Sequence, residues 1–221
     1  MLIRLAPFVA CAALLPACGP AETGDLTVRW GVGLTGTCTG ASLRHVVTEL
    51  ESSYGVVERR DEPCEAGFTR FLDVPVGTYR VHLVGYDEGD IPAYEATVNG
   101  VEVREDVASP LIVGRLAPRS GEIALAWYFE SGRLCSAYDV DTVTIHLFAD
   151  DTEVVRRDVA CDVGETVIGE LQTAAYDVRL DAIDRSGDTS HSYTLAGLKL
   201  RPGHHVDLEA ALAECDDGRC Y

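Results

Sequence analysis

The chain has little positive charge. It contains 18 Lys and Arg residues against 36 Asp and Glu residues, and its formal net charge is −18 over 221 residues. A surface of this sign repels nucleic acids and anionic lipid headgroups, so we expect no nucleic-acid partner. Since 47% of the residues are hydrophobic and 24% are charged, the composition is that of a globular protein. The acidity indicates a soluble surface, with weak binding of divalent cations as the alternative.

The sequence also lacks common catalytic signatures. It contains no G-x-S-x-G nucleophile motif, H-E-x-x-H zinc motif, phosphate loop or dinucleotide fingerprint. No cysteine pair has C-x-x-C spacing, which argues against a zinc site. None of the histidines lies in a recognisable catalytic setting, and we interpret all six as surface residues: His45, His82, His146, His191, His204 and His205. We therefore predict that the chain is not an enzyme.

The apolar run near the start of the chain is too short for a membrane span. The run Leu5–Leu15 falls short of the ~20 residues that a spanning helix needs. Arg4 precedes this run and small residues follow it, which is the order of a cleaved secretory signal. A buried core helix is the alternative interpretation. Residues 15–18, Leu-Pro-Ala-Cys, then resemble the lipobox of bacterial lipoproteins.

The lipobox resemblance implies a membrane anchor. It implies cleavage before Cys18, acylation of the Cys18 thiol and capping of the new amine with a further chain. Several acyl chains hold a protein on a bilayer where one chain would not, since each buried CH₂ contributes ~0.8 kcal/mol. Gly19, rather than Asp, follows the cysteine, and the resemblance then implies the outer membrane of a Gram-negative cell, on its periplasmic or surface face. The alternative is an ordinary secreted protein with Cys18 free.

An internal repeat divides the rest of the chain. The only two tryptophans, Trp30 and Trp127, lie 127 − 30 = 97 positions apart. The same offset relates Cys38 to Cys135, Cys64 to Cys161, and the segment 79–83 to 176–180. Shared spacing of this kind indicates two copies of one domain. We predict a signal peptide over 1–17, a lipidated tether over 18–24, domains over 25–116 and 122–221, and a linker over 117–121.

Apolar and polar residues alternate within each copy. Leu26, Val28 and Trp30 alternate with Thr27 and Arg29, and residues 123–129 repeat the pattern. A period of two is typical of strands with one buried face. Turn signals separate these runs at 53–55, 75–77, 88–90, 99–100 and 185–188. We predict an all-β fold with two tandem Ig-like antiparallel β-sandwich domains of about seven strands each. Only residues 208–215, LEAALAEC, are expected to be helical.

One hairpin carries a family resemblance. Residues 71–81, FLDVPVGTYRV, are similar to the V-P-x-G-x-Y-x-V hairpin of bacterial Ig-like, transthyretin-like and carboxypeptidase-regulatory-like sandwich domains. The resemblance implies that the Pro-x-Gly turn joins two strands and that Tyr79 packs at the edge of the sandwich. The second copy departs from the pattern, because residues 171–176 lack both Pro and Gly. As a whole, the chain resembles Gram-negative surface lipoproteins that carry tandem domains of this type, most of which have no assigned activity.

The repeat also predicts how the cysteines pair. Cys11 leaves with the signal and Cys18 carries lipid, so six cysteines remain: Cys38, Cys64, Cys135, Cys161, Cys215 and Cys220. Six cysteines allow fifteen pairings. Equivalent positions should form equivalent bonds, which predicts Cys38–Cys64 and Cys135–Cys161 and leaves Cys215–Cys220. Export from the cytoplasm makes these disulfides plausible.

The best candidate for a cation site is a pair of acidic loops. Asp87 and Asp90 in the first copy correspond in the chain to the loop of Asp184 and Asp188 in the second. Carboxylate oxygens on a tight loop suit Ca²⁺, the one cofactor that the sequence suggests. Asp and Gly are also the residues that any β-turn prefers, so a solvated turn is the competing interpretation.

These features favour a non-enzymatic, lipid-anchored envelope protein that presents two Ig-like domains as a binding or spacer surface. Sandwich domains carry function on their end loops, and the partner expected here is an envelope protein or a glycan. The alternative is a pair of accessory carbohydrate-binding modules, assisted by calcium. Exposed rings near one loop end would favour that alternative, and the candidates are Tyr54, Tyr86, Tyr94, Tyr138 and Tyr193.

Overall fold

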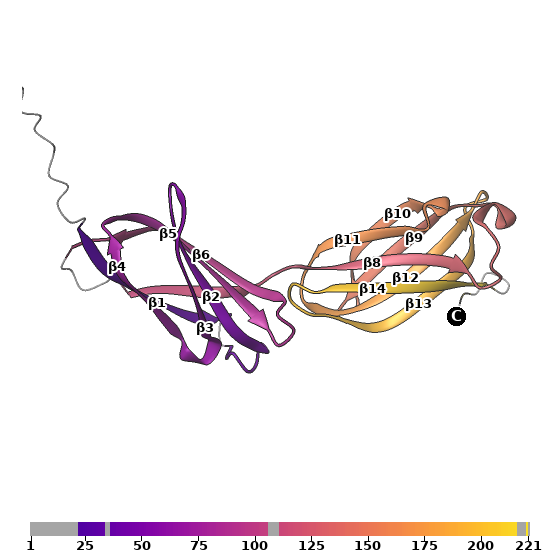
Figure 1. Cartoon of the computed structure of the whole chain (residues 1–221). Helices are drawn as coiled ribbons and strands as arrows, with labels where there is room; N and C mark the ends of the chain where they lie inside the picture. Colours follow the sequence, from indigo (N-terminus) through magenta and orange to yellow (C-terminus); the bar gives the residue numbers. More distant parts are fainter. Residues whose placement is uncertain (1–21, 34–35, 106–110, 216–219, 221) are drawn as a thin grey trace, which may run out of the picture.

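The computed structural model describes residues 22–33, 36–105, 111–215 and 220. These residues form two tandem β-sandwich domains that lie end to end (Figure 1). The predicted signal peptide and the lipidation site Cys18 lie outside the described residues. Among the described residues, no helix has the length and apolarity to cross a bilayer.

The first domain contains seven strands. They are β1 (Thr23–Val32), β2 (Leu43–Ser52), β3 (Gly55–Pro63), β4 (Phe68–Pro75), β5 (Gly77–Asp87), β6 (Pro92–Val103) and β7 (Leu111–Pro118). A short 3-10 turn, η1 (Cys64–Ala66), joins β3 to β4.

The second domain repeats this order. Its strands are β8 (Gly121–Phe129), β9 (Val140–Ala149), β10 (Thr152–Ala160), β11 (Glu165–Leu171), β12 (Ala174–Asp184), β13 (Thr189–Leu200) and β14 (His205–Glu214). Two 3-10 turns, η2 (Cys135–Tyr138) and η3 (Cys161–Val163), flank β9 and β10.

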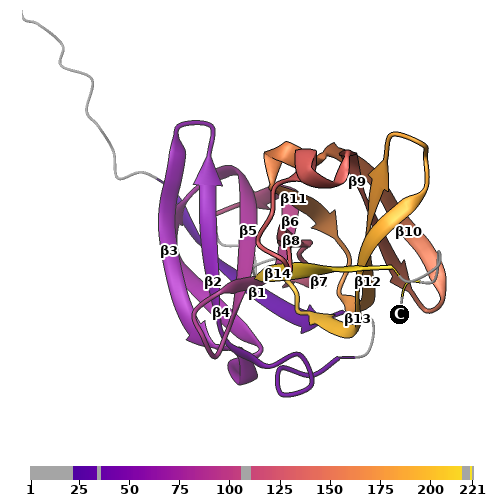
Figure 2. The ribbon, with the colours of Figure 1, turned by 90° about the vertical axis from the view of Figure 1, so that its right-hand side faces the viewer.

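Each domain folds its seven strands into two layers. The strand order in the first domain is β3-β2-β5-β6-β7-β1-β4, and in the second it is β10-β9-β12-β13-β14-β8-β11. Only two residue pairs join β6 to β7, and two join β13 to β14. At these narrow junctions the sheet turns over, so a four-stranded layer packs on a three-stranded one. Figure 2 looks onto the second domain, with the first domain behind it and to one side.

The alternating residues of both layers form a separate core in each domain. Each core holds the tryptophan of its copy: Trp30 Nε1 donates a hydrogen bond to the Cys64 carbonyl at 3.0 Å, and Trp127 Nε1 donates one to the Cys161 carbonyl at 3.1 Å. The same residue types at the same spacing therefore make the same buried contact twice.

Three disulfides are present. Cys38–Cys64 and Cys135–Cys161 each span 26 positions, and Cys215–Cys220 spans 5. These are the pairs that the repeat predicts. In each domain the longer bond ties the segment before β2 or β9 to the 3-10 turn after β3 or β10.

Three expectations about individual elements are wrong. Residues 208–215 are not helical, because 208–214 belong to β14, which pairs with β8 over eight residues. The β8–β14 pair and the β1–β7 pair are parallel, so the sandwiches are not wholly antiparallel. Asn99 and Gly100 do not end a strand: they lie inside β6, where Gly100 has φ 70° near a shift in register with β5.

The junction between the domains is short and bonded on both sides. Arg119, which follows β7, donates its N–H to the Ala93 carbonyl, and its own carbonyl accepts the Gly203 N–H. His204 Nε2 lies 2.6 Å from Asp87 Oδ2 across the junction. The loop between β13 and β14 therefore packs against the end of the first domain.

Candidate functional site

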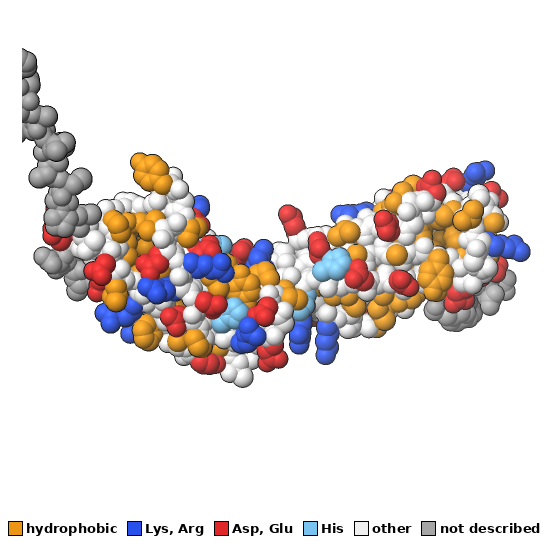
Figure 3. All heavy atoms as spheres, viewed as in Figure 1, with side chains coloured by type: hydrophobic (Ala, Val, Ile, Leu, Met, Phe, Trp, Pro, Cys, Tyr) orange, Lys and Arg blue, Asp and Glu red, His pale blue; other side chains and the backbone are white. Residues whose placement is uncertain are grey.

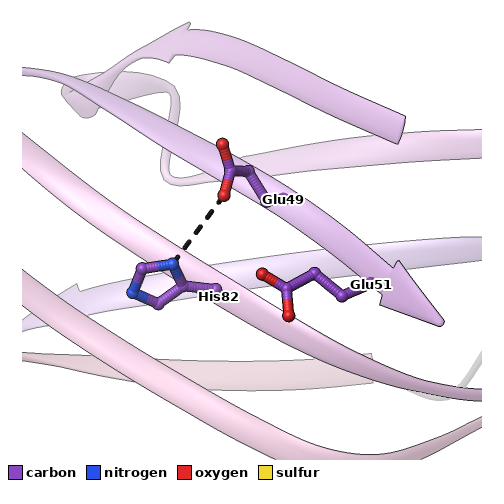
Figure 4. A group of neighbouring side chains, drawn as sticks. All are labelled: Glu49, Glu51 and His82. Carbon is purple, nitrogen blue, oxygen red and sulfur yellow. Dashed lines mark ion pairs between the residues drawn. The ribbon is translucent and has the colours of Figure 1, made fainter. Parts of the chain in front are cut away.

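Two glutamates and a histidine meet on the outer face of the first domain (Figure 4). The period of two along β2 brings Glu49 and Glu51 to the same face, and His82 on β5 is the register partner of Glu49. One ligand atom from each of the three lies within 4.8 Å of the others. His82 Nδ1 is 3.9 Å from Glu49 Oε2. Carboxylate and imidazole ligands of this kind suit a divalent transition metal.

Neighbouring arginines already neutralise this group. Arg59 Nε lies 3.7 Å from Glu49 Oε1, and Arg80 Nε donates a hydrogen bond to Glu51 Oε2 at 2.6 Å. A metal ion would have to displace these cations. The second domain does not repeat the group, since the equivalent residues are His146, Phe148 and Arg179. Sequence reasoning missed it because His82 lies some thirty positions from the two glutamates; only the outward alternation of both strands pointed to it.

Of the two predicted calcium ligands in the first domain, Asp87 caps a turn. Asp87 Oδ1 accepts hydrogen bonds from the N–H groups of Gly89 at 2.8 Å and Ile91 at 3.0 Å, and Oδ2 faces His204. Asp90 instead forms an ion pair with Arg44. Burial raises the pKa of Asp87, but the bonds from Ile91, His204 and Gly89 outweigh burial and lower that pKa overall.

The second acidic loop is built in the same way. Asp184 Oδ1 accepts hydrogen bonds from the N–H groups of Ser186 at 2.8 Å and Asp188 at 3.1 Å. The Ser186 hydroxyl also bonds Asp184, and this bond is the first cause of the lowered pKa of Asp184. Within the described residues neither loop gathers three ligand groups. Calcium binding at these loops stays a prediction that the geometry does not favour.

His191 is not a surface residue. It lies in β13 with 4% of its surface exposed, and its ring packs against Phe129 and Tyr138. Burial lowers its pKa, and the opposing charge of Glu214 only partly offsets that effect. Its Nδ1 is 3.1 Å from the Ser190 hydroxyl. A nucleophile and its base need an open position for substrate, whereas this imidazole is enclosed by aromatic rings.

The five candidate tyrosines do not form one platform. Tyr54, at the tip of the β2–β3 hairpin, is 99% exposed. The others are half-buried and come from separate elements: Tyr86 on β5, Tyr94 on β6, Tyr138 in η2 and Tyr193 on β13. Tyr86 is stacked on His45, with ring centroids 4.9 Å apart. This distribution favours structural roles for the half-buried rings.

A hollow of about 400 Å³ opens at the far end of the second domain, where β8 ends and η2 begins. Its lining combines an exposed ring, an exposed aliphatic side chain and polar groups: Tyr128, Leu134, Arg133, Ser136 and Asp162. The Cys135–Cys161 disulfide fixes the two 3-10 turns that border it. Concave apolar surface with a few polar groups is typical of a small-ligand site.

Comparisons with known proteins find only weak similarities. Neither a protein-family model nor a curated protein matches the sequence. Among solved structures, the chain is similar to the Bacillus anthracis TIE protein (TM-score 0.39, 11% identity), over 88% of this chain and 34% of that one. A fimbrial assembly protein from Parabacteroides distasonis matches with a TM-score of 0.38 and 11% identity, over 85% of this chain and 90% of that one.

A third similar structure is a B repeat unit of the collagen-binding surface protein of Staphylococcus aureus. Its TM-score is 0.29 and its identity 10%, over 87% of this chain and 100% of that one. The similarities in all three comparisons are low, and they carry no statement about what this chain binds.

Proposed function

We propose that the chain is a non-enzymatic, lipid-anchored protein of the cell envelope that holds a binding surface away from the membrane. The observation that carries this proposal is the position of the hollow. The first strand begins only 23 − 18 = 5 positions after Cys18. The hollow is lined by residues at the end of β8 and in η2, and these elements end at the opposite end of the two-domain rod (Figure 1).

The junction supports a spacer role. Hydrogen bonds from Arg119 and Gly203 and the Asp87–His204 contact hold the two sandwiches end to end. A rod anchored at one end places the loops at its other end at a fixed distance from the bilayer. The loop end is also where sandwich domains carry their binding residues.

The second candidate, a carbohydrate-binding module, rests on Tyr128. This ring is 53% exposed at the hollow, beside Arg133 and Asp162, and could pack against the face of a sugar. Arg133 and Asp162 would then supply hydrogen bonds to hydroxyl groups.

Two measurements test these proposals. Mass spectrometry of the mature N-terminus should find an acylated Cys18; an unmodified cysteine, or a start beyond it, would exclude the anchor. A glycan array, probed with the wild type and with Tyr128→Ala, should show binding that this substitution weakens about tenfold or more. Tyr54→Ala, which removes an exposed ring far from the hollow, is the matched control. Equal loss in both variants, or none in Tyr128→Ala, would exclude the hollow as a glycan site.

A further inference from the structure

The outer face of the three-stranded layer in the first domain gathers arginine and apolar side chains. We call this surface, formed by β7, β1 and β4, the arginine face. Arg29 projects from the central strand β1, and its register partners are Val113 on β7 and Phe68 on β4. All three are exposed, Val113 at 64% and Phe68 at 45%. Exposed residues on the flanking strands complete the face: Leu111, Arg115, Arg70 and Leu72.

The arginines of this face lack partners of opposite charge among the residues that the structure describes. Within the described residues, Arg29, Arg70 and Arg115 take part in no ion pair, whereas eight of the twelve other arginines do: Arg44, Arg59, Arg60, Arg80, Arg104, Arg119, Arg179 and Arg185. The acidic residues Asp25 and Asp73 lie at one margin, where Asp25 accepts the Asp73 N–H. In a chain of net charge −18, three unpaired arginines among apolar side chains mark a surface suited to an acidic partner.

The equivalent face of the second domain has the opposite charge. It is formed by β14, β8 and β11, and we call it the acidic groove. Ala126 takes the place of Arg29, and its register partners are Glu209 on β14 and Glu165 on β11. Asp207 lies two residues from Glu209 on the same exposed side and is the partner of Ala124. In the space-filling view, this side of the second domain shows acidic side chains and histidine, with blue side chains at its margins (Figure 3).

The acidic groove is also the concave counterpart of the arginine face. Ala124 and Ala126 are the small side chains on its central strand, and they lie between the larger residues of β14 and β11. The result is a hollow of about 620 Å³ whose lining includes Ala126, Glu165, Asp207 and Glu209. On the arginine face the central position holds the long side chain of Arg29 instead. At the groove margins, His205 bonds Glu122 and Asp207, and Arg157 donates to the Val167 carbonyl.

We propose that this chain associates with copies of itself by placing the arginine face of one copy in the acidic groove of the next. Arg29 would enter the alanine floor between Glu165 and Glu209, and Phe68 and Val113 would cover the apolar rim. The two surfaces differ, so the contact is head to tail and leaves one unused face at each end of the assembly. Such contacts extend into open chains unless the rotation between neighbours closes a ring.

The size of the two surfaces sets the expected strength. Three strands spaced ~4.8 Å apart, with about five residues each, give a contact of a few hundred Å² per partner, at the low end of specific interfaces. We expect a dissociation constant of tens to hundreds of micromolar at low salt. The association should weaken as ionic strength rises, since added salt screens the exposed charges.

The experiment is sedimentation velocity on the chain without residues 1–18, which retains every described residue. From about 10 µM to about 500 µM the mean mass should rise past that of a dimer, and the rise should be lost at about 0.5 M salt. Arg29→Ser/Arg70→Ser should weaken the association at least ~10-fold, and Glu165→Gln/Glu209→Gln should do the same. Arg59→Ser/Arg60→Ser, on the edge strand β3, removes two charges elsewhere and should leave the association unchanged. Circular dichroism checks that each variant is folded.

The decisive measurement mixes the Arg29→Ser/Arg70→Ser variant with the Glu165→Gln/Glu209→Gln variant. The first variant keeps an intact acidic groove and the second an intact arginine face, so an equimolar mixture should form a one-to-one complex and grow no further. The proposal is overturned if the wild type stays monomeric across this range, if the mixture forms no complex, or if the mixture grows as the wild type does. Salt-sensitive binding of the monomeric chain to vesicles containing anionic lipid, lost with Arg29→Ser/Arg70→Ser, would also overturn it, because the face would then serve a membrane.

Discussion

Single buried residues show how far the two copies have diverged. Thr48 on β2 is fully buried, and its hydroxyl has no hydrogen-bond partner among the described residues. The equivalent position in the second copy, 48 + 97 = 145, holds Ile145, which is also fully buried. A buried hydroxyl without a partner loses its hydrogen bonds to water and forms none in the protein, which lowers the stability of the fold.

We therefore expect Thr48→Val to raise the free energy of unfolding of the first domain by about 1 kcal/mol. Denaturant unfolding followed by circular dichroism measures it. Thr144→Val is the matched control, because Thr144 is also buried but donates to Asp158 Oδ1 at 2.8 Å. This control should lower the free energy of unfolding by about 1 kcal/mol. A loss of stability in Thr48→Val would mean that its hydroxyl has a partner after all.

His191 shows where residue-by-residue prediction fails. Its neighbours in sequence, Ser190 and Ser192, are polar, and a polar run is typical of a loop. The structure places it in β13 at the end of the core, because Phe129 and Tyr138 come from elements about fifty to sixty positions away. No local pattern contains that information.

At the scale of elements, β14 shows tertiary contacts overriding intrinsic propensity. Leu, Ala and Glu are strong helix formers, and they dominate residues 208–214. Ala210 and Leu212 are nevertheless fully buried in a strand that pairs with β8. Val113 pairs with Arg29 in the first domain, and Glu209 pairs with the equivalent residue, Ala126, in the second. Glu209 is therefore the counterpart of Val113, at an offset of 209 − 113 = 96, one less than the 97 that relates the other strands. A one-residue shift of the repeat therefore predicts this strand, and a search at the fixed offset of 97 misses it.

The disulfides differ in the length of chain that they close. On the chain-entropy relation, a separation of 26 corresponds to about 3.5 kcal/mol and a separation of 5 to about 2 kcal/mol. Cys135→Ala/Cys161→Ala should therefore destabilise the second domain by about 1.5 kcal/mol more than Cys215→Ala/Cys220→Ala. Calorimetry of both double variants measures this difference. A larger loss from the C-terminal pair would show that the Cys215–Cys220 loop stabilises the fold by more than closing a short segment.

At the scale of the whole molecule, the sequence predicts the duplicated domain and a location in the cell envelope. It does not predict the arginine face or the acidic groove. The offset of 97 indicates two domains, and alternation identifies their buried faces. The arginine face and the acidic groove escape prediction because each combines strands from opposite ends of a domain. Arg29 and Val113 become neighbours only through the parallel β1–β7 pair, which the sequence does not signal.

The junction between the domains depends on a glycine. Gly203 has φ 69°, and a Cβ there would lie 2.2 Å from the Pro92 carbonyl oxygen of the other domain. Gly197 has the same φ, but a Cβ there would meet nothing within 4 Å. Gly203→Ala and Gly197→Ala therefore share the backbone strain and differ in the clash. We expect Gly203→Ala alone to loosen the junction, seen as separate rotational correlation times for the two domains by NMR relaxation. Equal behaviour of both variants would show that the Pro92 contact does not hold the rod together.

We expect the Asp87–His204 contact to make the junction between the domains sensitive to acid. The pKa of Asp87 is lowered in the folded chain, since hydrogen bonds from Ile91, His204 and Gly89 outweigh the opposing effect of burial. A lowered pKa means that its contribution is complete above the unfolded value of about 3.9 and is lost as the pH falls through the lower folded value. The two domains should therefore tumble together at pH 7 and begin to move independently below about pH 4.

Asp87→Asn separates this effect from general acid unfolding. Asparagine keeps the oxygen that accepts the Gly89 and Ile91 bonds but places an NH2 group where the Oδ2 acceptor faces His204 Nε2, so this variant should show independent domain motion already at pH 7. Asp184→Asn, at the equivalent turn of the second domain, removes a carboxylate whose hydrogen bonds lie within its own loop and should behave as the wild type. If Asp87→Asn stays rigid at pH 7, the hydrogen bonds of Arg119 and Gly203 suffice to join the domains. The relative orientation of the domains would then depend on the backbone of the linker, and low pH would change domain motion only by unfolding the chain.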